Sequence, residues 1–142
     1  MDDARFSITS DSGFQRNMGY KVETGDGFAT VTLDLAEHHM NRANMLHGGA
    51  LMSLFDAALG YASAASVRKE GYGGLVTVSI TTNFLKPVTS GSVRVEAQRI
   101  GGGRKLIFAS GEAYDAAGEL FATCSGTFRR FTQPPRHDPV EG

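Results

Sequence analysis

Apolar and polar residues follow two different periods along the chain, and each period predicts a type of element. Between Asn41 and Val67, apolar side chains recur at spacings of three and four, which indicates a loop, a glycine-rich entry and one long helix. The opposite helical face is nearly as apolar, so we expect the helix to be buried on most of its sides. The face with the clearest spacing consists of Leu51, Leu54, Phe55, Ala58, Tyr61, Ala62 and Ala65.

Segments on both sides of this helix alternate with the period of two that is typical of strands. Before the helix, residues 20–23 and 28–35 flank a Gly/Asp turn and predict a hairpin. After the helix, the predicted strands are residues 75–85, 93–98, 104–114 and 120–131. Within 75–85, we expect one face to carry Val76, Val78, Ile80 and Phe84, and the other Thr77, Ser79, Thr81 and Asn83.

The order of these elements, two strands, one long helix and four strands, is typical of an α+β domain. Hairpin-length connections in the second half predict an antiparallel sheet, which can bury one apolar face by curling around the helix. The length of 142 residues fits a single domain. We expect an N-terminal arm at residues 1–17, a folded domain at 18–131 and a flexible C-terminal tail at 132–142. Phe6, Ile8 and Phe14 are the expected anchors of this arm or of a short helix within it.

Charge and composition narrow the classes of partner. A net charge of -1 without long basic runs argues against nucleic acid and anionic membranes. The apolar segment 51–65 raises the question of a membrane span, but it contains Asp56, Gly60 and several serines, so we expect no membrane insertion. The single cysteine, Cys124, excludes an intrachain disulfide, and the N-terminus shows no signal segment, so we expect a cytoplasmic protein.

Two features of the helical segment suggest chemistry on a carbonyl group. Asp56 is the only formally charged side chain between Arg42 and Arg68, and burying an unpaired carboxylate costs on the order of several kcal/mol. Such a carboxylate can act as a general base or as a nucleophile, and the sequence does not choose between these roles. The run His47-Gly48-Gly49 enters the helix, where backbone N–H groups and the helix dipole favour a developing negative charge.

A set of short motifs in fixed order carries a resemblance to a known family. Asn41 stands six residues before His47-Gly48-Gly49, and Asp56 stands nine residues after His47. Three further segments follow, which are residues 76–80 (V-T-V-S-I), 83–87 (N-F-L-K-P) and 103–105 (G-R-K). From Lys21 to Arg130, the chain thereby resembles the hotdog-fold acyl-CoA thioesterases, and within them the phenylacetate-pathway thioesterase group.

The resemblance implies a fold, an assembly and an activity. The fold is a long central helix wrapped by a curved antiparallel sheet of about five to six strands. The assembly is a homodimer whose sheets join edge to edge and whose active sites lie between subunits, with further pairing into a homotetramer. The activity is hydrolysis of a thioester of coenzyme A, or of a related pantetheine carrier, without a metal or redox cofactor. Aromatic and medium-chain acyl groups are the expected substrates.

The family's site residues carry over to specific positions of this sequence. The N–H of Gly48 would polarise the thioester carbonyl, Asp56 would be the nucleophile or general base, and Asn41 would orient water or substrate. Thr77 would help to hold the water, and His47 is expected to position or cap the helix entry. The expected contacts with the substrate or coenzyme A, the last three of them with its phosphates, are Gly49, Phe55, Lys86, Arg104 and Lys105.

One chain is not expected to complete this site by itself. Gly48 and Asp56 are eight residues apart beside one helix, which separates them by about 12 Å along the axis. A donor to the carbonyl oxygen and a base at the carbonyl carbon must both lie within about 3–4 Å of one reacting group. Two helices set antiparallel by a twofold axis would bring Gly48 of one chain toward Asp56 of the other.

Other interpretations of these features stay open at the level of sequence. The two glycines can form a close-packed turn, Asp56 can be a structural carboxylate, and residues 101–105 can be a simple hairpin turn. His38 and His39 lack a partner at metal-ligand spacing, so we expect no metal site, and Cys124 is expected in the core. Two other functions also handle acyl thioesters, namely a hotdog-fold hydratase or dehydratase and a non-catalytic acyl-CoA binding module.

Overall fold

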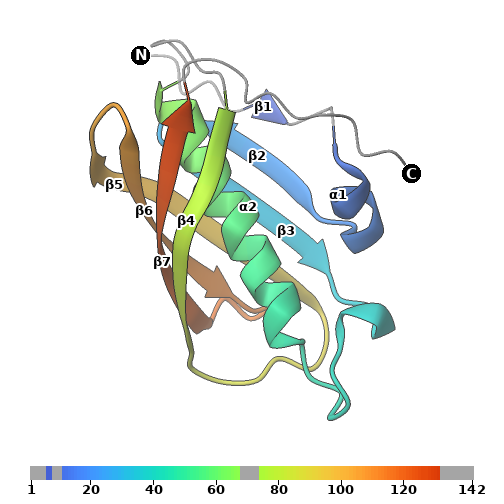
Figure 1. Cartoon of the computed structure of the whole chain (residues 1–142). Coiled ribbons are helices and arrows are strands. Elements are labelled where there is room, and N and C mark those ends of the chain that lie inside the picture. Colours follow the sequence, from blue (N-terminus) through green and yellow to red (C-terminus); the bar gives the residue numbers. More distant parts are fainter. Residues whose placement is uncertain (1–5, 8–10, 68–73, 132–142) are drawn as a thin grey trace.

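The computed structural model describes residues 6–7, 11–67 and 74–131, and it consists of an antiparallel sheet curved around one long helix (Figure 1). The predicted hotdog fold is confirmed. The predicted tail at 132–142 and part of the N-terminal arm, with Ile8, lie outside the described residues. The elements are β1 (Phe6–Ser7), α1 (Gly13–Met18), β2 (Lys21–Gly25), β3 (Phe28–Asp34), the 3-10 helix η1 (Glu37–His39), α2 (Gly48–Val67), β4 (Gly74–Phe84), β5 (Ser92–Gly102), β6 (Leu106–Tyr114) and β7 (Leu120–Phe131).

The N-terminal segment differs from the predicted arm in two respects. Helix α1 crosses the expected boundary between residues 17 and 18. Phe14, an expected anchor, is 54% exposed, so within this chain it anchors nothing. Gln15 is instead the buried residue of α1, and its side-chain amide donates to the carbonyl of Tyr20 at 3.2 Å.

The described strands form one sheet in the order β1-β2-β3-β5-β6-β7-β4. Each neighbouring pair is antiparallel, and hairpins join β2 to β3, β5 to β6 and β6 to β7. Strand β4 follows the helix in sequence but pairs only with β7 in this chain. An eleven-residue strand therefore forms one edge of the sheet, with backbone groups available for pairing.

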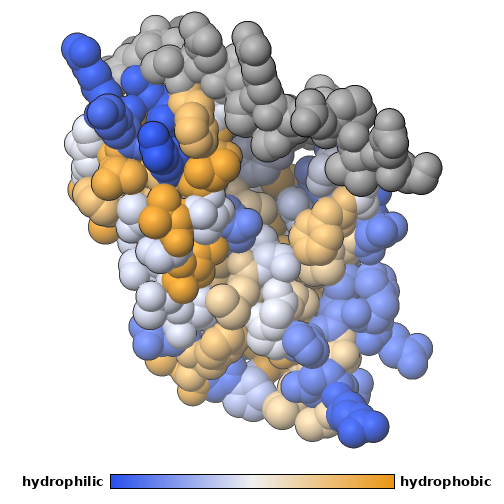
Figure 2. All heavy atoms as spheres, in the orientation of Figure 1, coloured by the Kyte–Doolittle hydropathy of each residue, from blue (hydrophilic) through white to orange (hydrophobic). Residues whose placement is uncertain are grey.

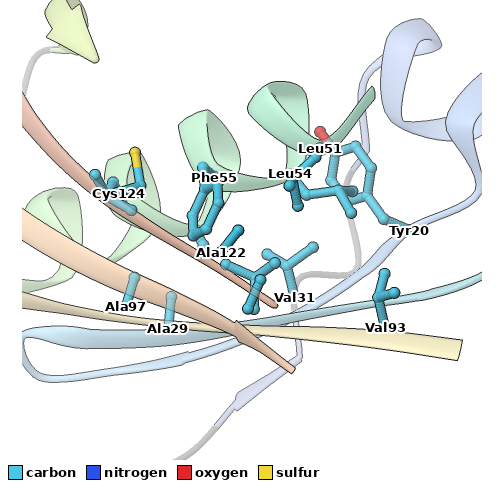
Figure 3. Close-up of a cluster of buried hydrophobic side chains, with 14 of the residues drawn as sticks. Tyr20, Ala29, Val31, Leu51, Leu54, Phe55, Val93, Ala97, Ala122 and Cys124 are labelled. Atoms are coloured by element: carbon cyan, nitrogen blue, oxygen red, sulfur yellow. The ribbon is translucent and has the colours of Figure 1, made fainter. Parts of the chain in front are cut away.

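Helix α2 packs its apolar face against the sheet and forms the centre of the core. Figure 3 shows side chains of this helix, among them Leu54 and Phe55, directed at small and branched residues of the strands. The approach is close at Leu59, because a Cβ on Gly111 or Gly126 would lie 2.8 or 2.9 Å from its methyl groups. Burial of each large side chain contributes about 1.5–3 kcal/mol, so this face of the helix is strongly held.

The other face of α2 is more open than predicted. Gly49, Met52 and Asp56 are exposed in this chain, so the expectation of a helix buried on most sides is wrong for the single chain. The periodicity does not reveal this, because alanine and glycine are weakly apolar and occupy much of the open face. By length and composition α2 would also be able to cross a membrane, but eight of its side chains are buried inside this fold.

Strand β4 departs from the predicted alternation because of a β-bulge. Its register with β7 shifts between Thr77 and Ser79, which leaves Val78 as the extra residue. Thr77 lies opposite the buried Phe128 and therefore faces the helix, on the same side as Ile80 and not with Ser79 as predicted. The predicted division of this strand into one apolar and one polar face is thus wrong at the bulge.

Apolar side chains are exposed along the free edge of the sheet. In Figure 2, hydrophobic surface gathers over β4 and the neighbouring strands, beside the open face of α2. The exposed fractions are 57% for Val78 and 55% for both Phe84 and Leu85. We call the set Met52, Val76, Val78, Phe84 and Leu85 the edge patch. A surface of this kind marks a site of interaction.

Candidate active site

The N-terminus of α2 presents an unused backbone donor. Gly48 is the first residue of the helix, and its N–H donates to no protein acceptor among the described residues. The preceding residue acts as a cap: His47 Nδ1 accepts the N–H of Gly49 at 2.9 Å, and its carbonyl accepts the N–H of Leu51 at 3.1 Å. The Gly48 N–H is thereby left available for an external oxygen, with the positive end of the helix dipole behind it.

Asn41 holds the loop that leads into the helix. Its Oδ1 accepts the N–H groups of Ala43 and Met45 at 2.9 and 3.1 Å, and its own N–H donates to the Met45 carbonyl at 2.7 Å. The side-chain nitrogen of Asn41 donates to no protein acceptor in the described part of the chain. Asn41 thus shapes its loop with one amide atom and keeps two N–H donors for a ligand.

A cavity of about 480 Å³ lies beside Gly48 and Asn41. Its volume falls within the range of small-ligand pockets, and its wall is mostly apolar. The ring of Phe84 closes one side, where a Cβ added to Gly48 would lie 3.4 Å from the ring. The remaining lining residues are Met45, Leu46, Leu51, Leu85, Lys86, Pro87, Val88 and Phe121. The site therefore offers a polar entrance and an apolar interior.

Asp56 and Thr77 form a second group of site residues. The Thr77 hydroxyl donates to Asp56 Oδ1 at 2.6 Å, and Oδ2 has no protein donor within the described ranges. The bulge at Val78 makes this contact, because it turns Thr77 toward the helix. Asp56 is exposed in the single chain and does not have the buried surroundings expected from the sequence. One carboxylate oxygen is thus oriented while the other is open to a reactant.

Phe55 does not occupy the position predicted for it. Its side chain is fully buried between α2 and the sheet, directed away from the open helical face (Figure 3). Successive residues of a helix point about 100° apart, so the exposure of Asp56 places its neighbour Phe55 in the core. The predicted contact between Phe55 and substrate is therefore wrong in this chain. Leu54 is also in the core, whereas Leu51 lines the cavity beside Gly48.

Arg104 lies at the opposite end of the molecule from the cavity beside Gly48. With Arg99, Gly103 and Arg130 it lines a second cavity of about 580 Å³, which we call the arginine cavity. Arg99 is fixed by bonds from Nη1 to Ser66 Oγ at 3.0 Å and from Nε to the Gly101 carbonyl at 3.3 Å. Arg130 Nε donates to the Arg104 carbonyl at 2.8 Å. The described residues place no carboxylate at ion-pair distance from Arg99 or Arg104.

Arg104 and Lys105 were predicted from the sequence, but Arg99 and Arg130 were not. They are separated by thirty-one residues, and only the pairing of β5, β6 and β7 brings them together. Lys105 is exposed next to this cavity, and its carbonyl accepts the N–H of Arg130 at 2.8 Å.

Lys86 is separate from this basic cluster. Its ammonium forms ion pairs with Asp115, at 2.9 Å, and with Glu119. Hydrogen bonds to Glu119 and Asp115 raise the pKa of Lys86, and the bond from Lys86 lowers the pKa of Asp115. The nine residues of β6 separate this position from Arg104 by about 30 Å, so one chain cannot apply both cations to the same phosphate. Lys86 is instead part of the wall beside Gly48.

Two further reactive side chains, the Cys124 thiol and the His39 imidazole, are held in the interior of the fold. Burial raises the pKa of the Cys124 thiol, which disfavours the thiolate needed by a nucleophile. Cys124 is buried in β7, as predicted. Both ring nitrogens of His39 bind backbone groups, and no group of three metal-ligating side chains occurs in the described part of the chain.

Within one chain, the predicted residues therefore form three groups. Asn41, His47, Gly48 and Gly49 lie at the start of α2, Asp56 and Thr77 lie near its middle, and Arg104 and Lys105 lie beyond its far end. The first two groups are separated by about 12 Å along the helix axis. A carbonyl bound at Gly48 is out of reach of Asp56 of the same chain.

Comparisons with known proteins find relatives of this chain in sequence. Residues 43–122 match the family described as Thioesterase superfamily. The "Putative esterase PA0474" of Pseudomonas aeruginosa is 35% identical over 101 residues, which cover 69% of this chain and 72% of that protein. An archaeal relative from Archaeoglobus fulgidus, named "Putative esterase", is 30% identical over 118 residues, covering 80% of this chain and 73% of the relative.

Solved structures support the same relationship. The conserved protein PA5202 of Pseudomonas aeruginosa has a TM-score of 0.79 and 32% identity, with 85% of this chain and 95% of that chain covered. A variant of the phenylacetic acid degradation protein PaaI of Thermus thermophilus has a TM-score of 0.76 and 26% identity, with 84% and 100% covered. Both matches extend over nearly the whole described domain.

Proposed function

Because the chain belongs to the thioesterase superfamily, a family of thioester hydrolases, we propose that it hydrolyses acyl thioesters of coenzyme A with aromatic or medium-chain acyl groups. The observation that carries this proposal is the unused Gly48 N–H at the mouth of an apolar cavity. An oxyanion needs such a preorganised donor, and an acyl group needs the apolar space behind it. The likeness to a phenylacetic acid degradation protein supports an aromatic acyl group. The single cysteine, free and buried, supports a cytoplasmic location.

The proposed chemistry uses Asp56 as the group that acts on the carbonyl carbon. As a base, its carboxylate removes a proton from water while the water oxygen bonds to the carbonyl carbon. As a nucleophile, it bonds to that carbon and forms an anhydride, which water then cleaves. In both routes the C–S bond breaks, the thiolate of coenzyme A leaves and takes up a proton, and the free acid is released. The bond from Thr77 to Oδ1 supports either role, since it leaves Oδ2 free to react.

The free edge of the sheet supports a dimer that completes the site. Antiparallel pairing of two β4 strands around a twofold axis at Thr81 would place Thr77 of one chain opposite Phe84 of the other, because Val78 is the extra residue of the bulge. Residues opposite each other lie on the same sheet face, and both of these face the helix. Since Thr77 binds Asp56 and Phe84 contacts Gly48, this register would bring Asp56 of one subunit to Gly48 of the other.

The same pairing would cover the edge patch and desolvate Asp56, which is exposed in the single chain. Burial of the patch would supply the association energy, at about 25 cal/mol per Å² of apolar surface. A homodimer with shared sites is therefore part of the proposal, and further pairing into a homotetramer is compatible with it. The partners implied are the acyl-CoA substrate and a second copy of the chain.

The arginine cavity is the proposed site for the phosphates of coenzyme A. Arg99 in its wall binds Ser66, which lies ten residues beyond Asp56 along α2, a distance of about 15 Å. The extended pantetheine chain separates the thioester from the phosphates, so coenzyme A can lie along the open face of α2. Arg99, which is held by its hydrogen bonds, and the exposed Arg104 and Lys105 supply the positive charge that phosphates require.

We expect replacement of Arg104 and Lys105 by alanine together to weaken binding more than chemistry. KM for acyl-CoA should rise at least ~10-fold, as for the loss of about 1.4 kcal/mol of binding, with a smaller change in kcat. The wild-type KM should also grow with ionic strength. A matched control, Lys21→Ala with Arg94→Ala, removes two charges from the outer sheet face and should leave KM unchanged. An equal rise in the KM for acyl-CoA and in the KM for a short pantetheine thioester in this double variant would contradict the assignment of the phosphate site.

Release of free thiol from a panel of acyl-CoAs, followed with a thiol reagent, tests the proposed function. The panel should contain acetyl, octanoyl, benzoyl, phenylacetyl and enoyl thioesters, with oxygen esters of the same acids as comparison. We expect thiol release, fastest with the aromatic or medium-chain thioesters and slower cleavage of the oxygen esters. Loss of the enoyl chromophore without thiol release would indicate a hydratase, and binding without either change would indicate a non-catalytic module.

A further inference from the structure

The buried imidazole of His39 has no part in the chemistry proposed above, yet it is tightly held. His39 is 2% exposed. Its Nδ1 accepts the N–H of Ala36 at 2.9 Å, and its Nε2 lies 2.7 Å from the carbonyl oxygen of Met18. A carbonyl only accepts hydrogen bonds, so Nε2 carries the proton in this arrangement and Nδ1 carries the lone pair. The ring therefore connects two backbone segments that are distant in sequence.

The backbone of His39 is connected directly to the entrance of the candidate active site. Its carbonyl accepts the N–H of His47 at 2.9 Å, and the next residue, Met40, forms an isolated β-bridge with Leu46. Asn41 follows and closes the loop through its bonds to Met45. The two sides of this loop are thus joined by the bond between His39 and His47, and Gly48 is the residue that follows His47.

The other end of the connection lies at the C-terminus of α1. Met18 is the last residue of that helix and packs against the hydrophobic core, and Gly19 follows in the left-handed conformation at φ 86°. The helix is itself held by the buried Gln15, which donates to Tyr20. The carbonyl of Met18 is therefore a fixed point, and His39 transmits its position to the loop.

We propose that His39 is a positioning residue that clamps the loop 37–47 to α1 and so holds Asn41 and His47 in place for catalysis. The inference rests on the proposed function, because the aligned groups are those of the proposed site. It also assigns a task to the N-terminal segment, whose helix α1 provides the acceptor for His39. Misplacement of such groups by about 1 Å can cost on the order of 100-fold in rate, so a clamp of this kind would act on kcat.

The chain offers matched variants for testing the clamp. His39→Leu removes both hydrogen bonds and keeps an apolar side chain in a buried position, whereas His39→Gln retains an amide N–H that can donate to the Met18 carbonyl. His38→Ala is the neighbouring control, since His38 is exposed and its ring lies 3.9 Å from that of His39. Ile107→Ala is a stability control, because Ile107 is fully buried in β6 far from the loop.

Two measurements on these variants decide the inference: steady-state kinetics with the best acyl-CoA, and amide hydrogen exchange at Leu46 and His47. We expect His39→Leu to lower kcat at least ~10-fold with KM changed less than ~3-fold, and to speed exchange at His47 at least ~10-fold. His39→Gln should recover much of kcat, and His38→Ala should resemble the wild type. Ile107→Ala should lower the Tm without lowering kcat.

Unchanged exchange at His47 in His39→Leu would overturn the clamp, and so would unchanged kcat in a variant whose exchange has increased. An equal loss of kcat in Ile107→Ala at a matched loss of Tm would also overturn it, since general destabilisation would then explain the effect. If the wild type cleaves no thioester, the proposed function fails, and exchange at His47 still decides whether His39 holds the loop.

Discussion

Replacement of Asp56 by asparagine should lower kcat for acyl-CoA hydrolysis at least ~100-fold and leave the fold intact. General-base catalysis by a positioned side chain is worth about 10² to 10⁴ in rate, and an amide cannot take the proton or form the anhydride. In the wild type, the Thr77 hydroxyl donates to Asp56 Oδ1 at 2.6 Å. The fold should persist because the asparagine Oδ1 can still accept this bond. Turnover, Tm and far-UV circular dichroism of the purified variant are the required measurements.

The control for this variant is Asp34→Asn. Asp34 is an exposed aspartate at the end of β3, and its side chain forms no hydrogen bond or ion pair among the described residues. It should therefore keep full activity. Near-native turnover by folded Asp56→Asn protein would remove Asp56 from the mechanism and leave it as a structural carboxylate.

The elements of this fold could be predicted from the sequence because their signals are local. Helical spacing between Leu51 and Ala65 and alternation from Val93 onward are set by neighbouring residues, and tight turns have their own residue preferences. Helix α2 and the strands β2 to β7 lie where those signals place them, with ends shifted by a few residues. The position of Gly48 at the first turn of the helix follows from the same local reasoning.

Strand order and the bulge could not be predicted in this way. The pairing of β4 with β7 joins residues between 38 positions (Phe84 and Ala122) and 57 positions (Gly74 and Phe131) apart, and no local pattern encodes it. The shift at Val78 depends on which backbone groups of the two strands pair, and alternation read from the sequence assigns Thr77 to the wrong face. The family resemblance assigned Thr77 and Asp56 to one site, but the hydrogen bond between them was not predicted.

The surroundings of Asp56 and Phe55 show a second limit of sequence reasoning. A helix with weakly apolar residues on every side does not indicate which face meets its own sheet and which face is open. In the structure Phe55 lies in the core and Asp56 is exposed, so the premise of burial within one chain was wrong although both residues lie on the predicted helix. Arg99 and Arg130 were missed because folding alone brings them together.

Exchange of subunits between two inactive variants should restore hydrolysis. Gly48→Pro removes the N–H proposed to bind the carbonyl oxygen, and loss of such a donor commonly costs about 10² to 10³ in rate. Gly48 is the first residue of α2, a position at which proline is well tolerated, so the variant should fold. Gly48→Ala is the matched control, because it keeps the N–H and adds one methyl group 3.4 Å from the Phe84 ring.

The prediction for the mixture follows from a site that uses Gly48 of one chain and Asp56 of the other. A heterodimer of Gly48→Pro and Asp56→Ala chains contains one site with both lesions and one site with neither. Random exchange at equal concentrations makes about half of the dimers mixed, so the mixture should reach about a quarter of wild-type activity. Each parent variant alone should stay at least ~100-fold below the wild type.

The most direct test of a shared thioester-hydrolysing site adds one further mixture to this experiment, and thiol release is measured in both. A chain that carries Gly48→Pro and Asp56→Ala together is exchanged with wild-type chains, and heterodimer formation is verified by native mass spectrometry. A shared site predicts recovery of activity in the first mixture and no activity from heterodimers in the second, since both of their sites then contain one lesion. No recovery in the first mixture, with heterodimers in the second retaining half of the wild-type activity, would contradict it and place the whole site within one chain.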